Sequence, residues 1–90
     1  MKGKRKSKGA VNLLDEQQRV IQKIGKRLKE LRLERGHSSY EIFAFENEID
    51  RSQYGKYERG ADLRISTLVK LLLALDISIE DFFSKGFKEK

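Results

Sequence analysis

Apolar residues recur at helical spacing over the first third of the chain. The first such set has members seven residues apart and further members in the intervening turns: Leu14, Ile21, Ile24, Leu28 and Leu31. This spacing predicts a helix over about residues 12–35, which Gly36 would end. Gly25 interrupts the pattern, and Asp15 and Glu16 would suit the first turn of a separate helix, so one long helix and two shorter ones both fit.

Polar capping residues indicate where the next two helices begin. Ser38 and Ser39 are candidate caps for a short second helix over about residues 39–47. Asp50 is a favoured cap for a third helix over about residues 50–60. A short helix, a tight turn and another helix make a helix-turn-helix unit.

The rest of the chain is also helical in pattern. A broad apolar set predicts a fourth helix over about residues 65–76: Ile65, Leu68, Val69, Leu71, Leu72 and Leu75. Ser78 begins a short fifth helix that carries Ile79, Phe82 and Phe83. No segment alternates in the manner of a strand. The expected fold class is therefore all-α, a compact bundle of about five helices in which helices 2 and 3 form the helix-turn-helix.

The ends of the chain differ from its centre in composition. Residues 1–10 hold five Lys or Arg and two Gly, which predicts a disordered basic tail, either an arm along phosphates or a solubilising segment. Residues 11–23 form a helical extension, residues 24–84 the helix-turn-helix domain, and residues 85–90 a frayed tail.

Charge and residue usage exclude several classes of protein. A formal net charge of +6 and a pI near 9.7 suit a polyanionic partner. The chain has no cysteine and His37 is its only histidine, so we expect no metal, no cofactor and no enzyme active site. No apolar run is long enough to cross a bilayer and no signal peptide is visible, so the predicted location is cytoplasmic, with no membrane partner.

The third helix has two opposed faces at 100° per residue. Tyr54 and Tyr57 point to one side, toward the bundle. The other side carries hydrogen-bond donors that suit base edges and phosphates, with Gln53 at its edge: Arg51, Ser52, Lys56 and Arg59. Gly55 lies between them, where a missing side chain would let the helix approach DNA closely. The alternative is an ordinary solvated basic face.

Three segments together resemble the Cro/lambda-repressor-like helix-turn-helix family, also called the XRE family. IGKRLKELRLERG resembles its first helix, SSYEIFAFENEIDRSQYGKYERG its helix-turn-helix, and LVKLLLALDISIEDFF its last two helices. The resemblance implies sequence-specific binding to double-stranded DNA, with the third helix in the major groove.

The resemblance also assigns roles to single positions. It makes Arg51, Ser52 and Lys56 the main base-reading residues, with Gln53 secondary. Ser39 is the cap of the second helix, and Tyr40 is a phosphate or groove-edge contact. Further candidates for the DNA backbone or groove edge are Gly55, Arg59 and Arg64. Arg32 and Glu58 correspond to a structural ion pair between the first and third helices.

The predicted function is a small transcriptional regulator, of repressor type, that acts as a homodimer on a two-fold operator. One alternative is the antitoxin of a toxin-antitoxin pair, which would also repress its own operon and bind a toxin. Another is a protein-protein adaptor with the same fold. Two apolar sets could form the dimer surface, Leu13 with Leu14, or the group Phe82, Phe83 and Phe87, although burial in the domain's own core is favoured for both.

Overall fold

The structure is a computed structural model that describes residues 3–88, with side chains from Leu13 onward. Five helices follow one another in the chain: α1 (Gly3–Glu34), α2 (Tyr40–Glu46), α3 (Arg51–Glu58), α4 (Ile65–Ala74) and α5 (Ile79–Phe82). The described residues contain no strand, so the predicted all-α fold class is confirmed. The outermost residues of the two predicted tails, 1–2 and 89–90, lie outside the described residues.

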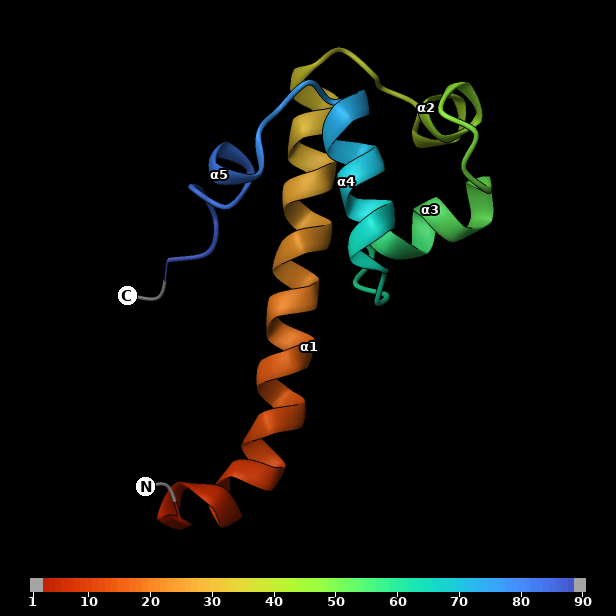
Figure 1. Cartoon of the computed structure of the whole chain (residues 1–90). Coiled ribbons are helices and arrows are strands. Elements are labelled where there is room, and N and C mark those ends of the chain that lie inside the picture. Colours follow the sequence, from red (N-terminus) through yellow and green to blue (C-terminus); the bar gives the residue numbers. More distant parts are fainter. Residues whose placement is uncertain (1–2, 89–90) are drawn as a thin grey trace.

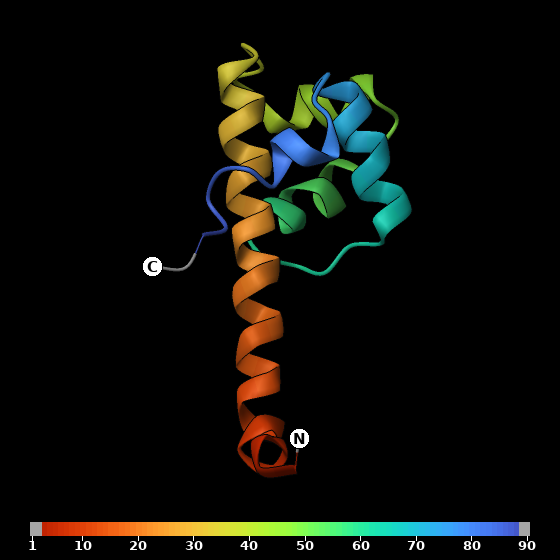
Figure 2. The ribbon, with the colours of Figure 1, turned by 60° about the vertical axis from the view of Figure 1, so that its left-hand side comes forward.

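Helix α1 is a single helix of 32 residues, so Gly25 does not divide it. It begins at Gly3, whereas the sequence predicted a disordered tail over residues 1–10. The chain contains no proline, and lysine, arginine and alanine all favour helix, so these residues let α1 continue through residues 4–10. The N-terminal half of α1 extends beyond the other helices, which gather around its C-terminal half (Figures 1 and 2).

Three of the short helices begin at residues that cap them with side-chain oxygens. Ser39, and not Ser38, accepts a hydrogen bond from the Ile42 N–H at 3.1 Å. Asp50 Oδ1 accepts from the Gln53 N–H at 2.9 Å, and Ser78 Oγ accepts from the Asp81 N–H at 3.0 Å. Each cap satisfies a backbone donor that the helix itself leaves unpaired.

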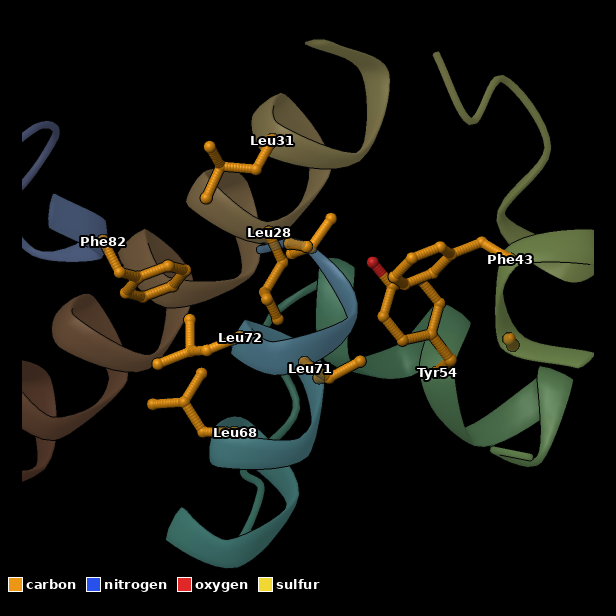
Figure 3. Packing of buried hydrophobic residues seen from close by; sticks show 10 residues of the cluster. Leu28, Leu31, Phe43, Tyr54, Leu68, Leu71, Leu72 and Phe82 are labelled. Carbon is orange, nitrogen blue, oxygen red and sulfur yellow. The ribbon is translucent and has the colours of Figure 1, made fainter. Parts of the chain in front are cut away.

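The core lies where the five helices converge (Figure 3). Its buried members come from all five helices and the C-cap of α4: Leu28, Leu31, Phe43, Ala44, Tyr54, Leu68, Leu71, Leu72, Leu75 and Phe82. In α1 the buried leucines continue the spacing seen in the sequence, but only from Leu28 onward.

Several apolar residues that fit the helical spacing face solvent instead. On α1, Leu13 is 55% exposed and Leu14 is 68% exposed, so the expected burial of this pair in the domain's own core is wrong. On α4, Ile65, Val69 and Leu73 form an exposed ridge at a spacing of four residues. Helical periodicity identifies an apolar face, but it does not say how far along that face the domain reaches.

The C-terminal segment folds back onto α5. Phe87 is half-buried, with its ring centroid 5.9 Å from that of Phe82 and 4.7 Å from that of Phe83. The predicted frayed tail over residues 85–90 therefore includes a packed aromatic residue. Phe82 is fully buried in the domain's own core, as expected for this group, whereas Phe83 is 36% exposed and Phe87 half-buried.

None of the described helices is both long enough and apolar enough to span a membrane.

Candidate nucleic-acid interface

Helix α3 exposes the residues that the sequence predicted to read bases. Arg51, Ser52, Gln53 and Lys56 are all exposed, as is Arg59 at the C-cap of the helix. Tyr54, on the opposite side, is fully buried against Phe43, with ring centroids 5.4 Å apart. The buried tyrosine fixes which side of α3 faces outward, so the polar side chains form one accessible surface.

Gly55 is buried, and the structure corrects the surface position predicted for it. A β-carbon at residue 55 would lie 2.9 Å from the ring of Tyr40 and 3.3 Å from Nη1 of Arg59. The missing side chain therefore makes room for Tyr40, at the start of α2, to lie against α3. The close approach that Gly55 permits is between two protein helices.

The other residues that the sequence predicted to contact the DNA backbone or groove edge lie at helix ends. Tyr40 is half-buried, and its ring centroid is 6.4 Å from that of Tyr54. Ser39 is half-buried and caps α2, so its hydroxyl oxygen already accepts a backbone hydrogen bond. Arg64 precedes α4 as its N-cap, makes no side-chain cap and is exposed. The structure thus leaves Arg64 available to a phosphate.

An ion pair joins α3 to α1, as predicted. Arg32 Nε donates to Glu58 Oε2 at 2.6 Å, and Nη2 donates to Oε1 at 3.1 Å, so the pairing is bidentate. The two side chains are only 4% and 7% exposed. Nη1 of Arg32 donates to the His37 carbonyl oxygen at 2.6 Å, which also ties down the loop before α2. Hydrogen bonding to Glu58 raises the pKa of the Arg32 guanidinium.

Comparison with known proteins agrees with this geometry. The sequence model of the helix-turn-helix family matches residues 28–82, which run from the buried half of α1 to the end of α5. The chain belongs to the helix-turn-helix family. Over 68 residues it is 34% identical to the control protein C.MunI of Mycoplasma sp, an alignment that covers 74% of this chain and 92% of that protein. No solved structure matches significantly.

These matches confirm the Cro/lambda-repressor-like, or XRE, family expected from the sequence. The protein is a DNA-binding transcriptional regulator and not an enzyme. The residues matched by the family include the whole of α2 and α3.

Arginines that link separate helices of this helix-turn-helix protein bind its own backbone or carboxylates. Besides Arg32, Arg27 is 5% exposed and donates from Nε to the Phe82 carbonyl oxygen at 2.7 Å, which fixes α5 to α1. Arg35 Nε donates to the Leu75 carbonyl oxygen at 2.8 Å, at the end of α4. Sequence reasoning missed the structural roles of Arg27 and Arg35, because nothing local distinguishes them from the exposed basic residues. Part of the positive charge is thus structural.

The hydroxyl of Tyr54 is buried beside the Arg32–Glu58 pair and has no hydrogen-bond partner among the described residues. Burial raises the pKa of this hydroxyl far above its ordinary value, and the carboxylate of Glu58 raises it further. The folded protein therefore keeps the Tyr54 proton at a pH where the unfolded chain loses it.

This difference predicts a loss of stability at alkaline pH. Above about pH 10 the unfolded chain releases the tyrosine proton and the folded protein does not, so the free energy of unfolding should fall as pH rises. In Tyr54→Phe this part of the fall should vanish, while stability near neutral pH should change little because the hydroxyl lacks a partner. Urea unfolding from neutral pH to above about pH 10 measures the stability and its alkaline fall in each variant. Tyr57→Phe, at a half-buried tyrosine, is the matched control. Equal alkaline slopes in the two variants would contradict the assignment.

Proposed function

We propose that this regulator binds a specific double-stranded operator as a homodimer and acts as a repressor, with α3 in the major groove. The observation that carries the proposal is the exposed set on α3, Arg51, Ser52, Gln53 and Lys56, opposite a fully buried tyrosine. Arginine and lysine donate to guanine O6 and N7, glutamine pairs with adenine, and serine adapts to several bases.

Groove-edge contacts would set the position of α3 on the duplex. The side chains of Tyr40 and Arg59 lie next to Gly55, where the start of α2 packs against α3. Arg64 is exposed at the N-cap of α4. Contacts of this kind bind phosphates and orient a protein without reading sequence. Ser39 would contribute its position at the N-terminus of α2 more than its already bonded side-chain oxygen.

A dimer is proposed because one such module binds DNA over a limited area. A single helix-turn-helix buries only about 600–1,000 Å² of protein surface on DNA, which limits its affinity. Two modules that read half-sites about one helical turn apart bind the operator more tightly than one. Repression follows if the operator overlaps a promoter. Similarity to a control protein over 92% of that protein's length favours a regulator over an antitoxin or an adaptor.

Selection of bound fragments from random DNA tests the whole proposal. We expect an enriched motif with two-fold symmetry and half-sites about ten base pairs apart. Enrichment of single half-sites without symmetry would contradict the dimer, and the absence of any motif would contradict sequence-specific binding.

Arg51→Ala tests base reading by α3. The variant should bind the selected operator about 5- to 150-fold more weakly, which corresponds to about 1–3 kcal/mol, and should lose preference at one base pair of each half-site. Lys85→Ala, which removes the same unit of charge from the exposed end beyond α5, is the matched control. Fluorescence anisotropy on the operator and on single-base variants measures both effects. An equal loss on random DNA would reduce Arg51 to a phosphate contact.

The basic N-terminus should contribute to DNA binding equally on all DNA sequences. Deletion of residues 2–8 removes five of the twenty Lys and Arg residues, so binding to all sequences should weaken and the slope of log affinity against log salt should become shallower. The measurement is the salt dependence of binding to operator and to random DNA. An unchanged slope would show that this segment makes no phosphate contact.

A further inference from the structure

Two hydrogen-bonding side chains from different helices come together over Gly55, where α2 packs against α3 (Figure 1). Tyr40 is the first residue of α2 and is half-buried, whereas Arg59 is the C-cap of α3 and is exposed. Cε1 of Tyr40 lies 2.9 Å, Cζ of Tyr40 3.2 Å and Nη1 of Arg59 3.3 Å from the position that a β-carbon of residue 55 would occupy. Because Cζ carries the hydroxyl group, a phenol and a guanidinium lie close to each other at this point of the surface.

Neither group is bonded by the protein itself. Within the part of the chain that the structure describes, the Tyr40 hydroxyl makes no hydrogen bond, and the Arg59 guanidinium makes neither a hydrogen bond nor an ion pair. The carboxylate that precedes Arg59 in the chain, that of Glu58, is paired with Arg32. The two donors are therefore available to an anion from outside the chain.

The position of these donors suits the DNA backbone more than the bases. In a helix-turn-helix unit the second helix reads bases with its N-terminal residues, and the first helix crosses the backbone. Arg59 ends α3 and Tyr40 begins α2, so both lie away from the N-terminal turn of α3. A backbone phosphate has two free oxygens, and hydrogen bonds to such a charged acceptor are short and strong.

We propose that Tyr40 and Arg59 bind the same phosphate of the DNA backbone as one site, for which Gly55 provides the space. The inference deepens the proposed function, because it joins two groove-edge contacts that separate phosphates could also receive. It requires DNA binding, but neither the dimer nor repression. Gly55 is a positioning residue in this site, since its missing β-carbon lets the phenol and the guanidinium approach each other.

Two donors on one phosphate depend on each other. Arg59 would hold the phosphate in place by its charge, so the hydrogen bond from the Tyr40 hydroxyl forms fully only while Arg59 is present. Donors on separate phosphates share no partner, and the free energies that they contribute add independently. The two arrangements therefore differ in what happens when both groups are removed.

A double-mutant cycle on duplex DNA of random sequence measures this dependence by fluorescence anisotropy. Tyr40→Phe keeps the ring against α3 and removes only the hydroxyl, so binding at a fixed salt concentration should weaken about tenfold. Made in the Arg59→Gln variant, the same substitution should weaken binding less than about twofold. Neither substitution should change the thermal unfolding of the domain, since neither group is bonded within the described residues.

Arg64→Gln is the matched control for charge. It removes a positive charge from another exposed residue of the proposed interface, so the slope of log affinity against log salt should become shallower by about one, as in Arg59→Gln. In the Arg64→Gln variant, however, Tyr40→Phe should keep its loss of about tenfold. Gly55→Ala places a β-carbon between the two donors and should reduce the effect of Tyr40→Phe to less than about threefold, with no change in the salt slope.

Equal losses from Tyr40→Phe in the parent protein and in Arg59→Gln would put the two donors on separate phosphates and overturn the inference. An unchanged affinity of Tyr40→Phe would overturn it as well, and so would an equal reduction of the Tyr40→Phe effect in Arg64→Gln. A protein that shows the expected dependence but selects no DNA motif would contradict the proposed sequence-specific function alone. A protein that selects a symmetric motif while the two losses are independent would contradict the shared phosphate alone.

Discussion

Glu58→Ala is expected to lower the free energy of unfolding by about 3–5 kcal/mol. The substitution leaves the guanidinium of Arg32 in a site where its side chain is 4% exposed, with no carboxylate to accept from Nε and Nη2. Removing one partner of a buried ion pair costs far more than the pair contributes, because the remaining charge is neither paired nor hydrated. Urea unfolding followed by circular dichroism measures the change.

Two further variants separate the buried charge from other causes. Glu46→Ala, at the exposed end of α2, removes the same chemical group and should change the free energy of unfolding by less than about 0.5 kcal/mol. Replacing both partners, with Arg32→Met and Glu58→Leu together, should restore much of the loss, because no unpaired charge is left. Full destabilisation in the double variant would instead point to the hydrogen bond from Arg32 to the His37 carbonyl oxygen as the main contribution.

Features of the fold that depend on local chemistry could be predicted from the sequence. Asp50 and Ser78 cap α3 and α5 as expected, because the acceptor and the backbone donor are three residues apart. The outward positions of Arg51 and Lys56 followed from the angle between each residue and the buried Tyr54 on one short helix. The Arg32–Glu58 pair needed the family resemblance, since 26 residues separate its members.

Features that depend on what packs across the fold could not be predicted in this way. Leu14 and Leu28 occupy equivalent positions in the α1 pattern, yet Leu14 is 68% exposed and Leu28 fully buried, because the domain covers only one half of the helix. Arg27 is buried because α5 supplies carbonyl oxygens from more than 50 residues away. Gly25 and Gly55 both weaken a helix when considered locally, and both are explained by the element that packs against them.

Gly25→Ala is expected to destabilise the protein by about 1–3 kcal/mol, although the same change in an exposed helix interior would stabilise it by up to about 1 kcal/mol. A β-carbon at residue 25 would lie 2.5 Å from the Tyr57 carbonyl oxygen and 2.8 Å from the Glu58 carbonyl oxygen. Both neighbours are backbone atoms at the end of α3, so no side chain can rotate away. The helices α1 and α3 would have to separate, which would also stretch the Arg32–Glu58 ion pair.

Gly55→Ala is the matched control for this prediction, since Gly55 is also buried in the middle of a helix. Its new β-carbon would meet the far end of the Tyr40 ring at 2.9 Å and a guanidinium nitrogen of Arg59 at 3.3 Å, and both side chains can shift. The gain in helix propensity should then offset most of the strain, so that the free energy of unfolding changes by less than about 1 kcal/mol. Chemical unfolding of the two alanine variants in parallel gives the comparison. If Gly25→Ala were as stable as Gly55→Ala, then α1 and α3 would not be held together by direct backbone contact at Gly25, and the Arg32–Glu58 ion pair and the burial of Tyr54 would remain as the contacts that position α3.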